Sequence, residues 1–164
     1  MKNTRRSGRE SALRSLYARE MHNAMEDVTP EAADYLCDTD ADDEGISIAQ
    51  RQSRAKTHPN PFADLLVKGV LANLDFINAT ISACSENWRI ERMSYVDRNI
   101  LRIAVFEIFF LPEVPSVVSI NEAIEIAKKY SDREAPAFIN GILNRVKEEY
   151  EKNCSPPQQP GVEP

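Results

Sequence analysis

The chain has 164 residues, the length of one ordinary domain, so we expect a single hydrophobic core. Its five glycines are scattered, which excludes a glycine-rich loop around a nucleotide phosphate and therefore P-loop enzymes and dinucleotide-binding folds. Three widely separated cysteines match neither a disulfide framework nor a zinc-binding pattern. No apolar run is long enough to cross a bilayer, and the unpaired cysteines fit a reducing cytosol, so we expect a soluble, cytoplasmic protein. Since no glycine-rich loop or metal-ligand pattern is present, we expect no cofactor.

The formal net charge of −6 hides a strong separation of charge along the chain. Residues 1–19 contain six basic residues and one acidic residue, whereas residues 20–50 contain ten acidic residues and no lysine or arginine. A short basic patch at Arg51, Arg54 and Lys56 follows. Because residues 28–61 also contain three prolines and little helical periodicity, we expect an extended acidic and basic surface segment there.

Apolar residues recur at helical spacing in the first half of the chain. Residues 12–21 place an apolar face on the basic N-terminal segment, with arginines on the other side. From residue 62 to residue 81 an apolar stripe repeats every three or four positions, which predicts one helix of about twenty residues. Gly69 lies on this stripe and is expected to allow close approach of a neighbouring element.

A central buried helix is predicted next. Ser94 and Asp97 stand three residues apart, the spacing of a helix N-cap and a first-turn acid. In the helix predicted for residues 100–111, apolar side chains occupy nearly every face, which is typical of a buried helix. We interpret Glu107 within it as half of an internal ion pair with a base such as Arg102, or as a cap of a buried backbone group, rather than as a perturbed general acid.

Two further helices are predicted in the second half of the chain. Ser119 and Glu122 have the spacing of a capping box, and helical periodicity follows to Tyr130. Pro136 then fits the first position of another helix, whose apolar stripe covers residues 138–146.

No alternating strand pattern of useful length occurs in the sequence. The predicted architecture is therefore all-α, with about six or seven helices. We expect residues 1–150 to form one helical domain. Residues 151–164 are rich in proline and glutamine, and we expect them to be disordered.

No motif for catalysis or metal binding is complete in this sequence. The alternate aspartates between residues 38 and 42 resemble a calcium loop, but the glycine and glutamate of such a loop are not at its sixth and twelfth positions. His22 and His58 lie far from each other and from every cysteine. The sequence therefore predicts neither a metal site nor catalytic residues.

The basic N-terminal segment carries an aromatic residue, Tyr17, among its arginines. Guanidinium groups bind phosphate, and an aromatic ring offers a stacking face for an unpaired base. The same combination recurs around a later helix junction, at Lys128, Lys129, Tyr130, Arg133 and Phe138. The two groups suggest one extended groove for single-stranded nucleic acid, with an ordinary solvated surface as the alternative.

Four sequence blocks occur in order along the chain: residues 5–17, 96–107, 120–128 after Pro115, and 138–143. Their order, spacing and content resemble the NusB family of bacterial transcription antitermination factors, over roughly residues 2–150. The resemblance implies an all-helical fold of two small bundles that binds the single-stranded boxA element of ribosomal RNA transcripts. It also implies NusE, a ribosomal small-subunit protein, as partner within the RNA polymerase antitermination complex, and no catalysis.

The resemblance and the basic-aromatic pattern together give a set of site residues. The expected RNA-binding residues are Arg5, Arg6, Arg9, Tyr17, Lys129, Tyr130, Glu134 and Phe138. Asp97, at the start of the central helix, matches an acidic position that faces the protein partner in the family.

Two other classes of function remain open. In a helical adaptor that does not bind RNA, the arginines would pair with the acidic segment of the same chain, and no salt-dependent RNA binding would be measured. The second class is a fragment of an RNA-modifying enzyme, because a related module precedes a methyltransferase in some such enzymes. No catalytic domain or cofactor-binding glycine pattern follows the module in this sequence.

Overall fold

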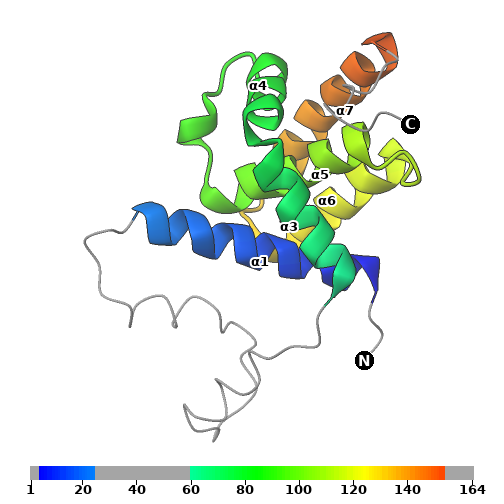
Figure 1. Cartoon of the computed structure of the whole chain (residues 1–164). Coiled ribbons are helices and arrows are strands. Elements are labelled where there is room, and N and C mark those ends of the chain that lie inside the picture. The colour runs from blue at the N-terminus through cyan, green and yellow to red at the C-terminus, as the bar shows by residue number, and fades with distance from the viewer. Residues whose placement is uncertain (1–3, 25–59, 154–164) are drawn as a thin grey trace, which may run out of the picture.

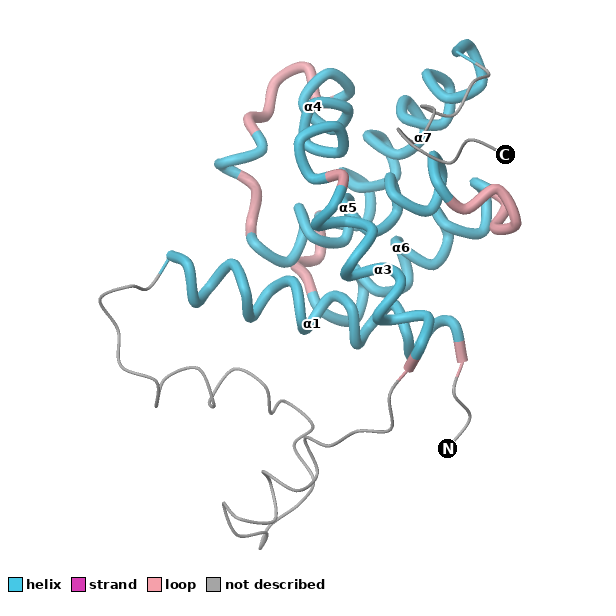
Figure 2. The backbone as a smooth tube through the Cα atoms, in the orientation of Figure 1, coloured by secondary structure: helices cyan, strands magenta, loops and turns pink. Residues whose placement is uncertain are grey.

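The computed structural model describes residues 4–24 and 60–153, and every regular element in these two ranges is helical. The elements are α1 (Arg5–Ala24), α3 (Pro61–Ala72), α4 (Leu74–Cys84), the 3-10 helix η3 (Ile90–Arg92), α5 (Tyr95–Phe110), α6 (Ser116–Tyr130) and α7 (Ala135–Asn153). No strand occurs in the described ranges (Figure 2), which confirms the predicted all-α architecture. Most of the predicted surface segment 28–61 and of the predicted tail 151–164 lies outside the described residues.

Helix α5 is the centre of the fold, and each of the other α-helices packs against it (Figure 1). Its first turn is capped as predicted, because the Ser94 hydroxyl oxygen accepts a hydrogen bond from the Asp97 amide at 3.0 Å. Residues 99–108 are all buried. The prediction of a buried central helix is therefore confirmed.

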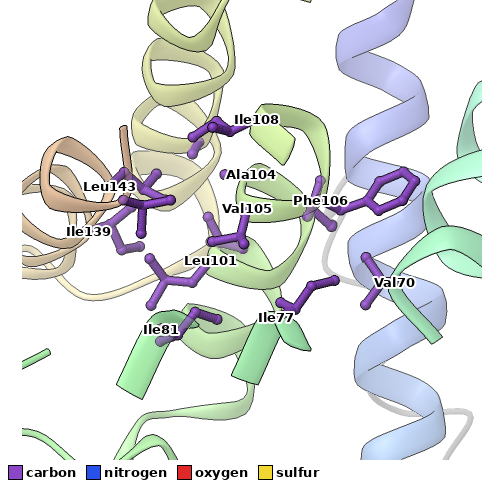
Figure 3. Close-up of a cluster of buried hydrophobic side chains, with 14 of the residues drawn as sticks. Val70, Ile77, Ile81, Leu101, Ala104, Val105, Phe106, Ile108, Ile139 and Leu143 are labelled. Atoms are coloured by element: carbon purple, nitrogen blue, oxygen red, sulfur yellow. The ribbon is translucent and has the colours of Figure 1, made fainter. Parts of the chain in front are cut away.

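The helices form two groups that share α5. Helices α1 and α3 cross each other on one side of α5, whereas α4, α6 and α7 pack on its other sides (Figure 1). Figure 3 shows the core of the second group, where Ile81 of α4 and Leu143 of α7 lie beside Leu101 and Val105 of α5. All four side chains are completely buried, and each contributes roughly 1.5–3 kcal/mol to folding.

The apolar stripe predicted as one helix forms two helices, α3 and α4, which meet at an angle of 79°. Asn73 separates them, and its side-chain amide donates to the carbonyl oxygen of Gly69 at 2.8 Å. Because the three-and-four spacing continues across the break, the spacing alone could not reveal it. Within the described ranges no single helix is long and apolar enough to span a membrane, although α3 and α4 taken together reach that length and composition.

Gly69 brings α3 close to α5, as expected from the sequence. A Cβ atom at this position would lie only 2.0 Å from the ring of Phe106 on α5. Any side chain larger than hydrogen would therefore push the two helices apart.

Helix α6 begins at Ser116, about one turn before the predicted capping box at Ser119 and Glu122. Its N-cap is Pro115, whose carbonyl oxygen accepts a hydrogen bond from the Ser119 amide at 3.1 Å. The capping-box prediction is wrong, because Ser119 and Glu122 both lie inside the helix rather than at its start. Helix α7 begins one residue before Pro136, so this proline is the second helical residue rather than the predicted first one.

Candidate nucleic-acid interface

Helix α1 buries one face and exposes basic side chains on the others. Its buried apolar residues, Ala12, Leu13 and Leu16, recur at helical spacing against α3 and α5. The exposed arginines are Arg5, Arg6, Arg14 and Arg19. The packing of α1 thus holds a basic surface in a fixed position on the molecule.

Arg9 is the exception on α1, because it is only 3% exposed. Its Nε donates to a carboxylate oxygen of Glu107 at 2.7 Å, and its Nη1 lies 3.8 Å from Glu122. Glu107 thus forms the predicted internal ion pair, but with Arg9 rather than with Arg102. Arg9 anchors α1 to α5 in this position, and a contact with RNA phosphate would require it to leave a buried pair.

Arg6 lies at the surface and pairs with α6. Its Nε and Nη2 donate to the two carboxylate oxygens of Glu122, each at 2.8 Å. The hydrogen bonds from Arg6 hold the pKa of Glu122 below its usual range, against the smaller opposing effect of burial. The pair occupies one edge of the guanidinium group and leaves its Nη1 edge for another acceptor.

A groove of about 310 Å³ lies between α1 and α6, whose backbones do not pack closely and are bridged by long side chains. It is lined by Arg6, Glu10, Glu125, Ile126, Lys128 and Lys129. Lys129 Nζ lies 3.4 Å from both carboxylate oxygens of Glu10, and Lys128 Nζ lies 3.0 Å from Glu125. These cations are paired with carboxylates, with which an incoming phosphate must compete.

Tyr130, the last residue of α6, extends this surface. Arg14 of α1 donates through Nη2 to its phenol oxygen at 3.0 Å, and Lys129 Nζ lies 5.0 Å from its ring centre. Contacts with Tyr130 and Glu10 raise the pKa of Lys129 despite partial desolvation, so this amine is charged at neutral pH. We call the whole surface the α1–α6 seam, formed by Arg6, Glu10, Arg14, Glu122, Glu125, Ile126, Lys128, Lys129 and Tyr130.

The other predicted RNA-binding residues lie outside the seam. The guanidinium group of Arg5 is 5.6 Å from the ring centre of Phe62. Tyr17 contacts Tyr95 edge to face at 6.3 Å between ring centres. Two more predicted residues lie near the start of α7: Glu134 is exposed, and Phe138 makes an edge-to-face contact at 6.2 Å with the half-exposed Trp88.

Asp97, the predicted partner-binding residue, is half-buried at the start of α5. Its carboxylate accepts a hydrogen bond from the hydroxyl group of Ser131 in the turn between α6 and α7. Ser131 directly follows Tyr130, so Asp97 is connected to the end of the α1–α6 seam by one hydrogen bond and one peptide link.

The model of the NusB family matches residues 6–148 of the chain. The chain belongs to the NusB family. It is 44% identical over 143 residues to the transcription antitermination protein NusB of Geotalea daltonii, covering 87% of this chain and 93% of that relative. The structure of T. maritima NusB is similar, with 33% identity, a TM-score of 0.63, and coverage of 91% of this chain and 94% of that one.

A crystal structure of NusB and NusE in complex with dsRNA shares the fold. Its TM-score is 0.63 at 22% identity, and the match covers 92% of this chain and 100% of that one. The NusB-like, all-helical fold expected from the resemblance is thus confirmed.

Two contacts of the seam and one exposed aromatic residue near α7 have little signal in the sequence. Arg14 is separated by 116 positions from Tyr130, and Arg6 by the same interval from Glu122, so neither contact could be inferred from local spacing. Trp88 follows α4 without a motif, and only its exposure beside Phe138 makes it conspicuous. Among residues 4–24 and 60–153 no cluster of histidine, cysteine, aspartate and glutamate has the makings of a metal site.

Proposed function

We propose that this protein is a non-enzymatic transcription antitermination factor that binds single-stranded boxA RNA of ribosomal RNA transcripts together with NusE. The observation that carries the proposal is the α1–α6 seam, where Arg6, Lys128 and Lys129 lie on one surface with Tyr130. Cationic side chains bind the RNA backbone, and an aromatic ring stacks on an unpaired base. Membership of the NusB family and a fold shared with a NusB–NusE–RNA complex support it.

Each predicted residue takes a role in this proposal. Arg5, Arg6 and Lys129 are exposed and contact phosphates, while the Tyr130 ring stacks on a base. The remaining predicted RNA contacts, outside the seam, are Tyr17, Glu134 and Phe138. Arg9 acts mainly by fixing the first turns of α1, because its guanidinium group is buried against Glu107.

The proposed NusE surface includes Asp97. Replacing Asp97 by asparagine keeps a hydrogen-bond acceptor for Ser131 but removes the charge, so it is expected to weaken NusE binding more than it lowers thermal stability. Calorimetric titration with NusE measures the first effect and thermal unfolding the second. Unchanged NusE affinity would leave Asp97 only a structural role at the start of α5.

The proposed function is tested by titrating the protein into labelled single-stranded boxA RNA, with and without NusE, at several salt concentrations. A scrambled RNA of the same length and composition is the control. We expect tighter binding to boxA, further tightening by NusE, and affinity that falls steeply with salt. NusE binding without salt-dependent RNA binding would favour a helical adaptor instead.

A further inference from the structure

The cations of the α1–α6 seam differ in their partners. Arg6, Lys128 and Lys129 each contact a carboxylate, at 2.8, 3.0 and 3.4 Å respectively. Arg14 is also exposed, but it donates to the neutral phenol oxygen of Tyr130 at 3.0 Å. Within the described ranges, Arg14 is the cation of this seam whose side chain forms no ion pair with a carboxylate.

This difference determines what a phosphate gains at each position. A phosphate that binds Arg6 or Lys129 competes with a carboxylate already in place, and charge-assisted hydrogen bonds are roughly twice as strong as neutral ones. A phosphate at Arg14 displaces no charged partner. The net gain in electrostatic free energy is therefore largest at Arg14.

The geometry around Arg14 also suits a nucleotide. The bond to Tyr130 uses one of the five N–H donors of the guanidinium group and leaves the others for phosphate oxygens. The same bond restrains both side chains, and the Arg14 Cζ atom lies 5.8 Å from the Tyr130 ring centre. A phosphate held by Arg14 therefore lies next to a ring on which a base can stack.

We propose that Arg14 and Tyr130 form a nucleotide subsite for single-stranded RNA, in which Arg14 binds a backbone phosphate and Tyr130 stacks on an adjoining base. This subsite rests on the proposed RNA-binding function and adds a residue to it. It makes Arg14, rather than the carboxylate-paired Arg6, the strongest phosphate contact of the α1–α6 seam.

The test compares Arg14→Gln with Arg19→Gln in titrations of single-stranded boxA RNA. Both arginines are exposed on α1 and both changes remove one charge, but Arg19 lies about 140° further around the helix. Arg14→Gln is expected to weaken binding about tenfold, the effect of losing one hydrogen bond to a charged group. It should also reduce the slope of log affinity against log salt by about 0.7, as for one lost phosphate contact.

Two more variants separate a specific contact from general charge. Arg14→Lys keeps the charge without the planar donor fork, so it should recover only part of the affinity. Tyr130→Phe keeps the ring but removes the anchor of Arg14. We expect its effect to be small alone and to disappear in the Arg14→Gln background, because the two residues act together.

As a control, circular dichroism of each variant measures whether the helices are intact. If Arg14→Gln binds boxA RNA as tightly as Arg19→Gln does, or if Arg6→Gln costs more affinity than Arg14→Gln, the subsite is wrong while the proposed function stands. If the wild-type protein does not bind boxA RNA at any salt concentration, both are wrong.

Discussion

Two neighbouring arginines of α1 show how burial changes the role of one residue type. Arg9 is buried against Glu107, whereas the side chain of Arg6 is 54% exposed in its pair with Glu122. Removing one partner of a buried ion pair leaves the other charge without compensation, whereas an exposed pair is screened by water. The arginine-rich block thus combines a residue that holds the fold with residues that face solvent.

We therefore expect Arg9→Gln to destabilise the protein by about 3–5 kcal/mol, because it leaves the carboxylate of Glu107 buried without its partner. Arg6→Gln should have a much smaller effect on stability and act mainly on RNA affinity. Urea unfolding followed by circular dichroism measures the difference. An Arg9→Gln variant with wild-type stability and weakened RNA binding would instead support the direct phosphate contact predicted from the sequence.

A second prediction at this scale concerns Gly69, where an added Cβ atom would lie 2.0–2.6 Å from three atoms of the Phe106 ring. That ring is stacked on Phe110 at 5.3 Å and cannot easily move away. Gly69→Ala is therefore expected to destabilise the protein by about 1–3 kcal/mol. Gly141 in α7 is the matched control, since nothing lies within 4 Å of its added Cβ atom.

Gly141→Ala should raise stability by up to about 1 kcal/mol, because alanine favours the helix more than glycine does. Thermal unfolding of the two variants gives shifts of opposite sign if the close approach at Gly69 is real. Equal shifts would show that α3 and α5 tolerate a methyl group between them.

At the scale of the helices, the sequence predicts what is local and misses what depends on distant residues. Apolar residues on nearly every face of residues 100–111 predict the burial of α5, and the Ser94 cap predicts where this helix begins. The break at Asn73 is invisible because the apolar spacing continues through it. For the candidate site, the structure brings the predicted Arg6, Lys129 and Tyr130 onto one surface. The burial of Arg9 was not predicted, because it depends on Glu107, 98 positions away.

The end of α1 is joined to α5 by Glu20. Its carboxylate accepts hydrogen bonds from Asn99 at 2.7 Å and Arg102 at 2.9 Å, and it pairs with Arg98 at 2.8 Å. Burial disfavours the charged form of Glu20, but the hydrogen bonds from Arg102 and Arg98 outweigh this and lower its pKa below the ordinary 4.5. The folded state therefore binds a proton at Glu20 less readily than the unfolded chain.

A lowered pKa in the folded state contributes stability that is full above pH 4.5 and is lost as the pH falls through the folded pKa. We expect Glu20→Gln to be less stable than wild type at neutral pH, with the difference shrinking as the pH falls below 4.5. Urea unfolding at a series of pH values measures it, with the exposed Glu113→Gln as control. A difference that does not depend on pH would mean that the Glu20 charge does not hold α1 to α5.

At the scale of the whole molecule, the proposed RNA and NusE surfaces meet at the turn between α6 and α7. Tyr130 ends the α1–α6 seam, and the next residue, Ser131, donates a hydrogen bond to Asp97 at the start of α5. We therefore expect a ligand that orders one surface to lower the cost of ordering the other. Thermodynamic linkage requires the two effects on affinity to be equal.

We expect NusE to tighten boxA binding, and boxA RNA to tighten NusE binding, by the same factor of roughly fivefold or more. Ser131→Ala removes the hydrogen bond to Asp97 without changing any charge, so it should bring this factor towards one. Each ligand alone should bind the variant within about twofold of wild type, because Ser131→Ala leaves the charge of Asp97 and the ring of Tyr130 in place. Calorimetric titration of each ligand in the presence and absence of the other measures the factor, with the exposed Ser15→Ala as control. Full coupling in Ser131→Ala would mean that the two surfaces communicate by direct contact between RNA and NusE rather than through the α6–α7 turn.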